Sequence, residues 1–148
     1  MIRLIMIGHI SNIPPASPPM RRSFGIGAFI GILGSLLNMV GIFFPWSYSL
    51  ASHIYWTMGT DLQIGWFTFF ISIFAIISFV FRTRTGYLLG FIFGVLALII
   101  SGSYFFLIQI DSHYIVGGLC LSFAGSILMT IGGIIGFLRT PKEGTVNR

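Results

Sequence analysis

The chain has 148 residues, of which 55% are hydrophobic, 16% aromatic and only 7% charged. Soluble domains carry about 25% charged residues and disordered chains are polar and poor in aromatics, so this composition excludes both classes. The net charge of +5 comes from small groups of Lys and Arg between apolar runs rather than from one basic face, which argues against nucleic-acid binding. We therefore predict an integral membrane protein.

The first segment, residues 1–22, is rich in proline and is predicted to be a flexible cytoplasmic tail. Its apolar start is too short to span a bilayer, and no small-residue cleavage site of a signal peptide follows it. Met20 is followed by Arg21 and Arg22 and then by the first apolar run. This order raises the hypothesis that the native protein starts at Met20, which an intact-mass measurement tests.

Four apolar runs follow, at about 23–44, 62–81, 86–108 and 114–138. Each has about 20 to 25 residues, enough at 1.5 Å per residue to cross the hydrocarbon core of a bilayer. None contains Asp, Glu, Lys, Arg or His, and none alternates as a barrel strand would. Residues 23–138 are therefore predicted to form an all-α, antiparallel bundle of four transmembrane helices, followed by a cytoplasmic tail at 139–148.

The basic residues predict an orientation for this bundle. The basic residues nearest the ends of the runs are Arg21, Arg22, Arg82, Arg84 and Arg139. The connections at 45–61 and 109–113 contain no Lys or Arg, so all eight positive charges fall on one side, which the positive-inside rule assigns to the cytoplasm. We predict that both termini lie inside the cell membrane, with a net charge of +7 on that side and −2 outside.

Aromatic residues gather at the predicted outer connections. The residues expected to act as interface anchors are Trp46, Trp56, Trp66 and Tyr114. Trp and Tyr prefer the headgroup level of a bilayer because one end of the ring is apolar and the other forms hydrogen bonds. The alternative is a docking surface for a partner, a lipid or a quinone. Residues 46–50 alternate between large and small side chains, which predicts either a short strand or an interfacial segment.

Small residues recur at helical spacing and predict where the helices touch. The predicted helix-packing residues are Gly27, Gly31, Ser35, Asn38, Gly86, Gly90, Gly94, Gly118, Ser122, Gly125, Gly132 and Gly136. Helices in a bilayer associate by close packing, which small residues permit. From Trp66 onward the second run has no glycine and is rich in Phe. We therefore predict that the first, third and fourth helices form the tight centre and that the second exposes the most surface to lipid.

Asn38 is the one carboxamide in the middle of a predicted span. A buried amide needs a hydrogen-bond partner, so a bridge between helices is expected, and a functional role is the alternative.

The predicted outer connections hold the only candidates for metal ligands. These candidates are His53, Asp61, Asp111 and His113. Short ligand spacing such as H-x-x-x-H is absent, and the two aspartates fit helix starts, with Thr60 and Gln63 at the spacing of a capping box. No G-x-S-x-G motif and no phosphate loop after a strand occur. We therefore predict no metal, no cofactor and no enzymatic activity.

In layout the chain resembles claudin-like and other tetraspan proteins. Residues 23–138 combine four predicted spans, both ends inside, a larger first outer loop and a shorter second one. Pro45-Trp46 and Gly59-Thr60-Asp61 are similar to segments of small four-span proteins of prokaryotes. Claudins pair two cysteines after a Trp in the first outer loop. No cysteine follows Trp46 within this loop, so the resemblance implies the layout and not a barrier function.

We expect a non-enzymatic polytopic membrane protein that acts by helix association. It would serve as an accessory or structural subunit of a membrane complex or as a homo-oligomer, with the bilayer and other membrane subunits or itself as partners and no nucleic acid. The alternative is a pore or small-solute transport subunit lined by Ser, Thr and Asn38.

Overall fold

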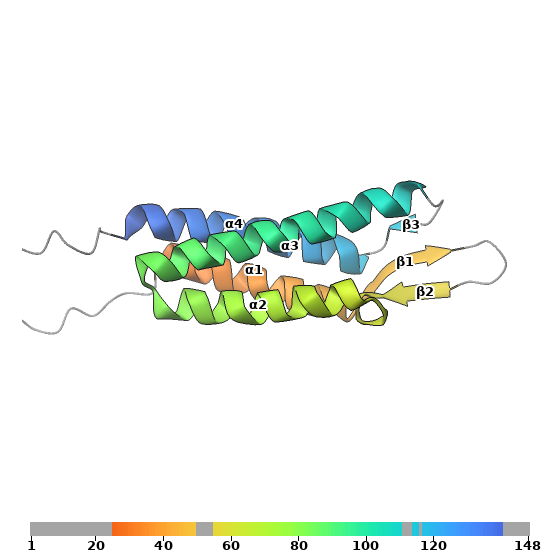
Figure 1. The fold of residues 1–148 in the computed structure, drawn as a ribbon, viewed down its shortest axis with the longest axis horizontal. Helices are drawn as coiled ribbons and strands as arrows, with labels where there is room; N and C mark the ends of the chain where they lie inside the picture. Colours follow the sequence, from red (N-terminus) through yellow and green to blue (C-terminus); the bar gives the residue numbers. More distant parts are fainter. Residues whose placement is uncertain (1–24, 50–54, 111–113, 116, 141–148) are drawn as a thin grey trace, which may run out of the picture.

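The computed structural model describes residues 25–49, 55–110, 114–115 and 117–140. Four helices run side by side: α1 (Ile26–Ile42), α2 (Gln63–Phe81), α3 (Arg84–Ile110) and α4 (Gly117–Arg139) (Figure 1). A small sheet lies at one end and consists of β1 (Pro45–Ser49), β2 (Tyr55–Met58) and β3 (Tyr114–Ile115), with the 3-10 helix η1 (Gly59–Asp61) after β2. The predicted helical bundle is therefore present. We call this end the sheet end.

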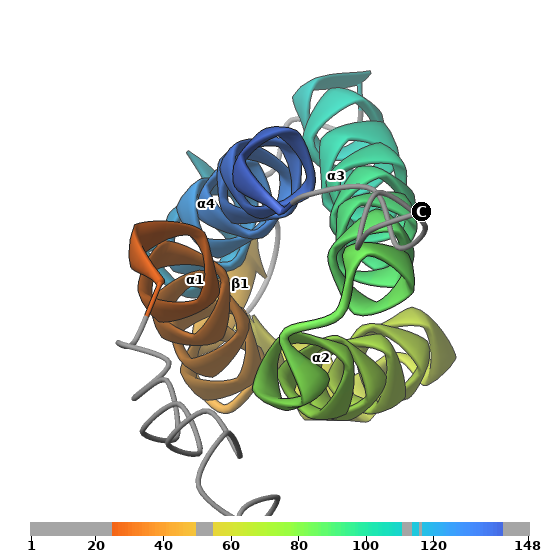
Figure 2. The same cartoon turned by 90° about the vertical axis from the view of Figure 1, so that its left-hand side faces the viewer.

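The helices are arranged around the bundle in chain order, and α4 closes the circle against α1 (Figure 2). The most extensive contacts join α4 to α1 and to α3, while α2 packs less extensively against α1 and α3. The prediction that α1, α3 and α4 form one tight centre is therefore wrong in one respect. α4 is the partner that α1 and α3 share, and those two helices lie across the bundle from each other.

Three helices, α2, α3 and α4, are long and apolar enough to cross a membrane. α1 is also apolar but has 17 residues, which corresponds to about 25 Å. Its predicted run started at 23, and residues 23 and 24 lie outside the described residues.

The helices α2 and α3 both present much of their circumference outside the bundle. A smaller share of residues is buried in the apolar stretch of α3 (22%) than in that of α2 (33%) or α4 (39%). The shorter helix α2 nevertheless makes less extensive contacts with its neighbours than α3 does. The prediction that α2 exposes the most surface therefore stays a prediction. Each of the two helices sends one aromatic ring into the bundle, Phe79 from α2 and Tyr87 from α3.

The sheet joins the two connections at its end of the bundle. β1 is central and pairs antiparallel with both β2 and β3, with Tyr48 opposite Trp56 on one side and opposite Tyr114 on the other. Residues 46–50 were predicted to form either a short strand or an interfacial segment, and residues 46–49 lie in the strand β1. The fourth span was predicted to start at Tyr114, but Tyr114 and Ile115 form β3 and α4 begins at Gly117. Aromatic and β-branched residues favour strands, and β1 offers them a partner.

The start of α2 also differs from the predicted capping box. Thr60 belongs to η1, and the N-cap of α2 is Leu62, which makes no side-chain capping bond. The carboxylate of Asp61 instead accepts a hydrogen bond of 2.9 Å from the backbone N–H of Met58. The aspartate therefore caps the turn that precedes the helix rather than the helix itself.

At the opposite end, α2 and α3 are joined by two residues only. Arg82 ends α2 in the left-handed conformation, with a φ of 50°. Thr83 Oγ1 then accepts a hydrogen bond of 3.0 Å from the backbone N–H of Gly86 in the first turn of α3. Arg84 is the first residue of α3 rather than part of the connection. We call this end, with Arg82, Arg84 and Arg139, the arginine end.

The contact between α1 and α4 is made by backbone against backbone. A Cβ added to Gly125 would lie 2.5 Å from the backbone nitrogen of Asn38 and 2.6 Å from the backbone carbonyl oxygen of Gly34. At the arginine end a Cβ on Gly27 would lie 2.5 Å from the amide nitrogen of Gly136. Every predicted helix-packing residue is buried. Small residues therefore line this contact from one end to the other.

We predict that Gly125→Ala destabilises the fold by about 1–3 kcal/mol, because the added methyl group meets backbone that cannot move aside. The matched control is Gly102→Ala in α3, where the nearest atom to an added Cβ, in the ring of Phe123, is 3.6 Å away. Thermal unfolding in detergent, followed by circular dichroism, measures both. Equal midpoints for the two variants would show that the contact is not tight.

Candidate functional site

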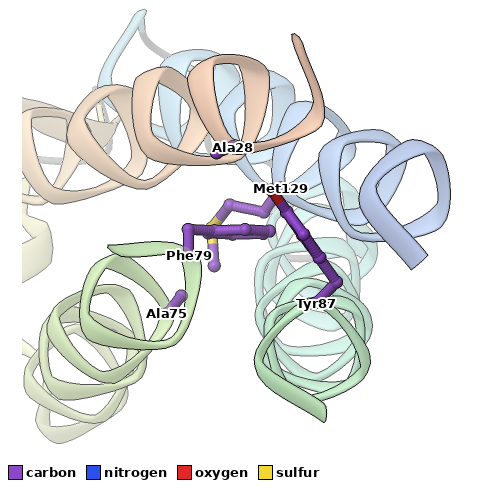
Figure 3. Close-up of a cluster of buried hydrophobic side chains, with 5 residues drawn as sticks. All are labelled: Ala28, Ala75, Phe79, Tyr87 and Met129. Atoms are coloured by element: carbon purple, nitrogen blue, oxygen red, sulfur yellow. The ribbon is translucent and has the colours of Figure 1, made fainter. Parts of the chain in front are cut away.

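The interior toward the arginine end is filled by the ring of Phe79 from α2. Phe79 is fully buried, and a Cβ added to either Gly31 of α1 or Gly90 of α3 would collide with its ring. Figure 3 shows the ring reaching from α2 into the space between the other helices, beside Met129 and opposite Tyr87. The buried side chains of this cluster are Ala28, Ala75, Phe79, Tyr87 and Met129. Two glycines thus make the room that one aromatic ring occupies.

The interior at the sheet end is filled by Trp46 of β1. Its side chain is fully buried, together with Ile42 and Leu119, and its ring lies 5.3 Å from that of Tyr104. The indole Nε1–H donates a hydrogen bond of 3.0 Å to the carbonyl oxygen of Gly41. Trp46 was predicted to anchor the protein at the membrane interface, and the structure corrects this. A β-bulge between Pro45 and Ser47 accompanies its inward position.

Between these two clusters lies a layer of small polar side chains. Two helical turns, about 10 Å, separate Gly31 from Asn38 on α1, and the same seven residues separate Phe79 from Ser72 on α2. The two helices are antiparallel, and Gly31 contacts Phe79, so Asn38 and Ser72 lie at the same level. On α4, Gly125 contacts Asn38 directly. We call the buried residues at this level and within about one turn of it the Asn38 layer: Ser35, Asn38, Thr68, Ser72, Ser101, Ser122 and Ser126.

Asn38 is fully buried in this layer, and the bridge between helices that was predicted for its carboxamide is present only as a weak contact with α4. Its Nδ2 donates only a long contact of 3.8 Å to the sulfur of Met129. Its Oδ1 has no hydrogen-bond partner, and it is the one buried side-chain nitrogen or oxygen in the described residues of which this is true. The hydroxyl of Ser122 reaches the backbone carbonyl of Asn38, at 3.4 Å, rather than the carboxamide.

Apart from that of Ser122, the hydroxyls of the layer bond to their own helices. Ser72 donates to the carbonyl oxygen of Thr68, Ser101 to that of Ala97 and Ser126 to that of Ser122, each at 2.8 Å. This is the ordinary way in which Ser and Thr satisfy their protons inside a helix. The hydroxyl protons of the layer are therefore donated to backbone carbonyl oxygens, and the hydroxyl oxygens remain available as acceptors.

The other predicted interface anchors lie at the sheet end. Trp56 and Trp66 have 55% and 45% of their side chains exposed. Trp66 Nε1–H donates a hydrogen bond of 3.0 Å to the carbonyl oxygen of Thr60, which leaves the apolar face of the ring outside the bundle. The ring of Trp56 packs against Tyr48, 5.3 Å away. Tyr114 is placed by its backbone in β3, opposite Tyr48.

Of the metal-ligand candidates only Asp61 is described, and His53, Asp111 and His113 lie outside the described residues. The carboxylate of Asp61 is bonded to the N–H of Met58. Within the described ranges no three His, Cys, Asp or Glu side chains lie together as metal ligands would.

The charged residues of the described ranges lie at the two ends of the bundle. Arg82, Arg84 and Arg139 lie at the arginine end, and Asp61 lies at the sheet end. Arg84 places its guanidinium 4.4 Å from the centre of the Phe137 ring, a cation–π contact that joins the start of α3 to the end of α4. Arg21 and Arg22 lie outside the described residues.

Residues that the sequence pattern did not single out complete the interior. Phe79 was one Phe among many in a glycine-free run, and Tyr87 was not selected at all, although its ring lies against Gly136 of α4. A signal for Phe79 does exist in the sequence, because Ser72, Ala75 and Phe79 follow one another at helical spacing on an otherwise bulky helix. The spacing alone does not reveal which large residue points inward.

No protein-family model matches this chain, and the comparison with curated proteins finds no match.

We predict that Trp46→Phe lowers the stability by about 1–3 kcal/mol, because it removes the buried hydrogen bond to Gly41 and part of the filling of the sheet end. The control is Trp56→Phe, which changes an exposed side chain and should stay within about 0.5 kcal/mol of the parent. Chemical unfolding in mixed micelles measures both variants. If Trp56→Phe is the more damaging, the assignment of the two tryptophans is wrong.

Proposed function

We propose that the chain is a multi-pass protein of the cell membrane with four spans and both termini in the cytoplasm. Three helices that are long and apolar enough to span, and a fourth apolar helix packed among them, support this. The separation of Arg82, Arg84 and Arg139 from Asp61 along the bundle supports the orientation, since the arginine end would be the cytoplasmic side. In this arrangement the sheet lies on the outer side, which agrees with the claudin-like layout.

The proposed role is non-enzymatic and rests on association, as an accessory or structural subunit of a membrane complex or as a homo-oligomer. The observation that carries it is the filled axis of the bundle. Phe79 and Met129 occupy one half, Trp46 and Leu119 the other, and all four are fully buried. A single copy with this interior favours a structural role over a permeation path.

The surface available for association differs from the one that the glycine pattern suggested. Most glycines of α1 and α4 already lie against the other of these two helices or against residues of α2 and α3, so a partner helix would pack elsewhere. The remaining outward surface of α3 carries Leu88, Ile92, Leu96 and Ile99, each more than 40% exposed. The sheet offers a second surface at the proposed outer side, with Trp56 and Met58 exposed.

The alternative, a pore or small-solute transport subunit, has one observation in its favour. The Asn38 layer is a polar level in the middle of an apolar bundle, and the oxygen of Asn38 is unpaired. Polar groups inside transmembrane bundles often mark pathways. The two apolar clusters on either side would then have to open in turn.

Crosslinking in native membranes, followed by purification in mild detergent and mass spectrometry, tests the association. We expect a stable complex with another membrane subunit or with a second copy. Purified protein in liposomes provides the other arm, in which we expect no solute flux above empty liposomes. Flux that disappears in Asn38→Leu but persists in Gln63→Leu, at the exposed start of α2, would instead establish the transport alternative.

The placement in the bilayer is tested with three variants that each keep one tryptophan and replace the other two by Phe. In liposomes with brominated lipids we expect strong quenching of Trp56 and Trp66 fluorescence and weak quenching of Trp46, because Trp46 is fully buried. Quenching of Trp46 as strong as that of Trp66 would contradict both the burial and the proposed placement.

A further inference from the structure

The carboxamide oxygen of Asn38 poses a specific energetic problem. Leaving a buried carbonyl without a donor costs about 1–3 kcal/mol, and nearly all buried polar groups in proteins have a partner. Asn38 cannot turn outward, because α4 lies against its backbone, with a Cβ on Gly125 only 2.5 Å from its amide nitrogen. Exchanging the positions of Oδ1 and Nδ2 would not give Oδ1 a donor, because the sulfur of Met129 can only accept a hydrogen bond.

The neighbouring helices cannot supply the missing donor from their hydroxyls without losing other bonds. Ser72 and Ser126 lie near the level of Asn38 on α2 and α4. Each donates its hydroxyl proton to a backbone carbonyl oxygen at 2.8 Å. Each of these hydroxyl oxygens retains a free lone pair as an acceptor. The Asn38 layer thus contains several acceptors, and its weakly engaged donors are Asn38 Nδ2 and the hydroxyl of Ser122, which donates to the backbone carbonyl of Asn38 at 3.4 Å.

A water molecule has the complementary set of groups. It donates two protons and needs about three hydrogen bonds to be held inside a protein. One proton can go to Asn38 Oδ1 and the other to a hydroxyl oxygen of the layer, while the water oxygen can accept from Asn38 Nδ2. The layer is polar on several helices, whereas the clusters of Phe79 and Trp46 on its two sides are apolar.

We propose that the Asn38 layer is a binding site for one internal water molecule, held by Asn38 and by the hydroxyl of Ser72 or Ser126. The site belongs to the fold and does not depend on the proposed function. It accounts for the presence of a carboxamide in a position where a backbone contact prevents a direct bridge between helices.

The test uses the full chain labelled with ¹⁵N-asparagine in detergent micelles. The chain has Asn only at positions 12, 38 and 147, so the carboxamide signals of Asn38 are identified by their loss in Asn38→Leu. We expect a rotating-frame Overhauser cross-peak between these protons and a water resonance, with the sign of direct contact rather than of chemical exchange. Cross-peaks to a serine hydroxyl alone, or none to water, would overturn the proposal.

Two further variants separate this site from general hydration of the bundle. Ser72→Ala with Ser126→Ala removes both hydroxyl acceptors, and we expect loss of the water cross-peak while the Asn38 signals remain. The matched control is Ser78→Ala on α2, a buried serine that donates in the same way to the carbonyl oxygen of Phe74 at 2.8 Å. A cross-peak that survives in the double variant, or that is lost equally in Ser78→Ala, would also overturn the proposal.

Discussion

The direct approach of the α1 backbone to the α4 backbone is the constraint on which the rest of the bundle depends. Gly27 lies against Gly136, Gly31 against Gly132 and Gly34 against Gly125, so no side chain separates the two helices along this line. In a bilayer such contacts replace the hydrophobic driving force that packs soluble helices. Because α1 and α4 bring mainly backbone to their shared face, the largest side chains of the interior come from other elements.

The consequences of this approach are seen at both ends of the bundle. Toward the arginine end α2 supplies Phe79, whose ring uses the space left by Gly31 and Gly90. At the sheet end the described helical residues supply no fully buried ring, and Trp46 from β1 is turned inward instead, against the partly buried Tyr104 of α3. The sheet is therefore not a separate appendage, since its central strand contributes the largest buried side chain of the bundle.

The same approach explains why the polar residues of the middle behave as they do. Asn38 lies where the α4 backbone is closest, so its carboxamide finds no group on α4 other than the sulfur of Met129. Ser72 and Ser126 bond to their own helices, and only Ser122 reaches another helix, through a long hydrogen bond of 3.4 Å to the backbone carbonyl of Asn38. Cohesion in this bundle thus comes from shape and close contact, and the buried polar groups contribute little to it.

The sequence by itself determined the helical bundle, the approximate extents of its helices and the separation of charge. These features depend on local composition, because a long run of apolar residues without charge favours a helix whatever surrounds it. It also marked Gly27, Gly125 and Gly136 as contact residues through their spacing. Only the tertiary structure decided that Trp46 is buried while Trp56 is exposed, that Tyr114 belongs to a strand, and that Phe79 is the large side chain of α2 that points inward. These outcomes depend on which side chain fits the space that other helices leave, and no local pattern in the chain contains that information.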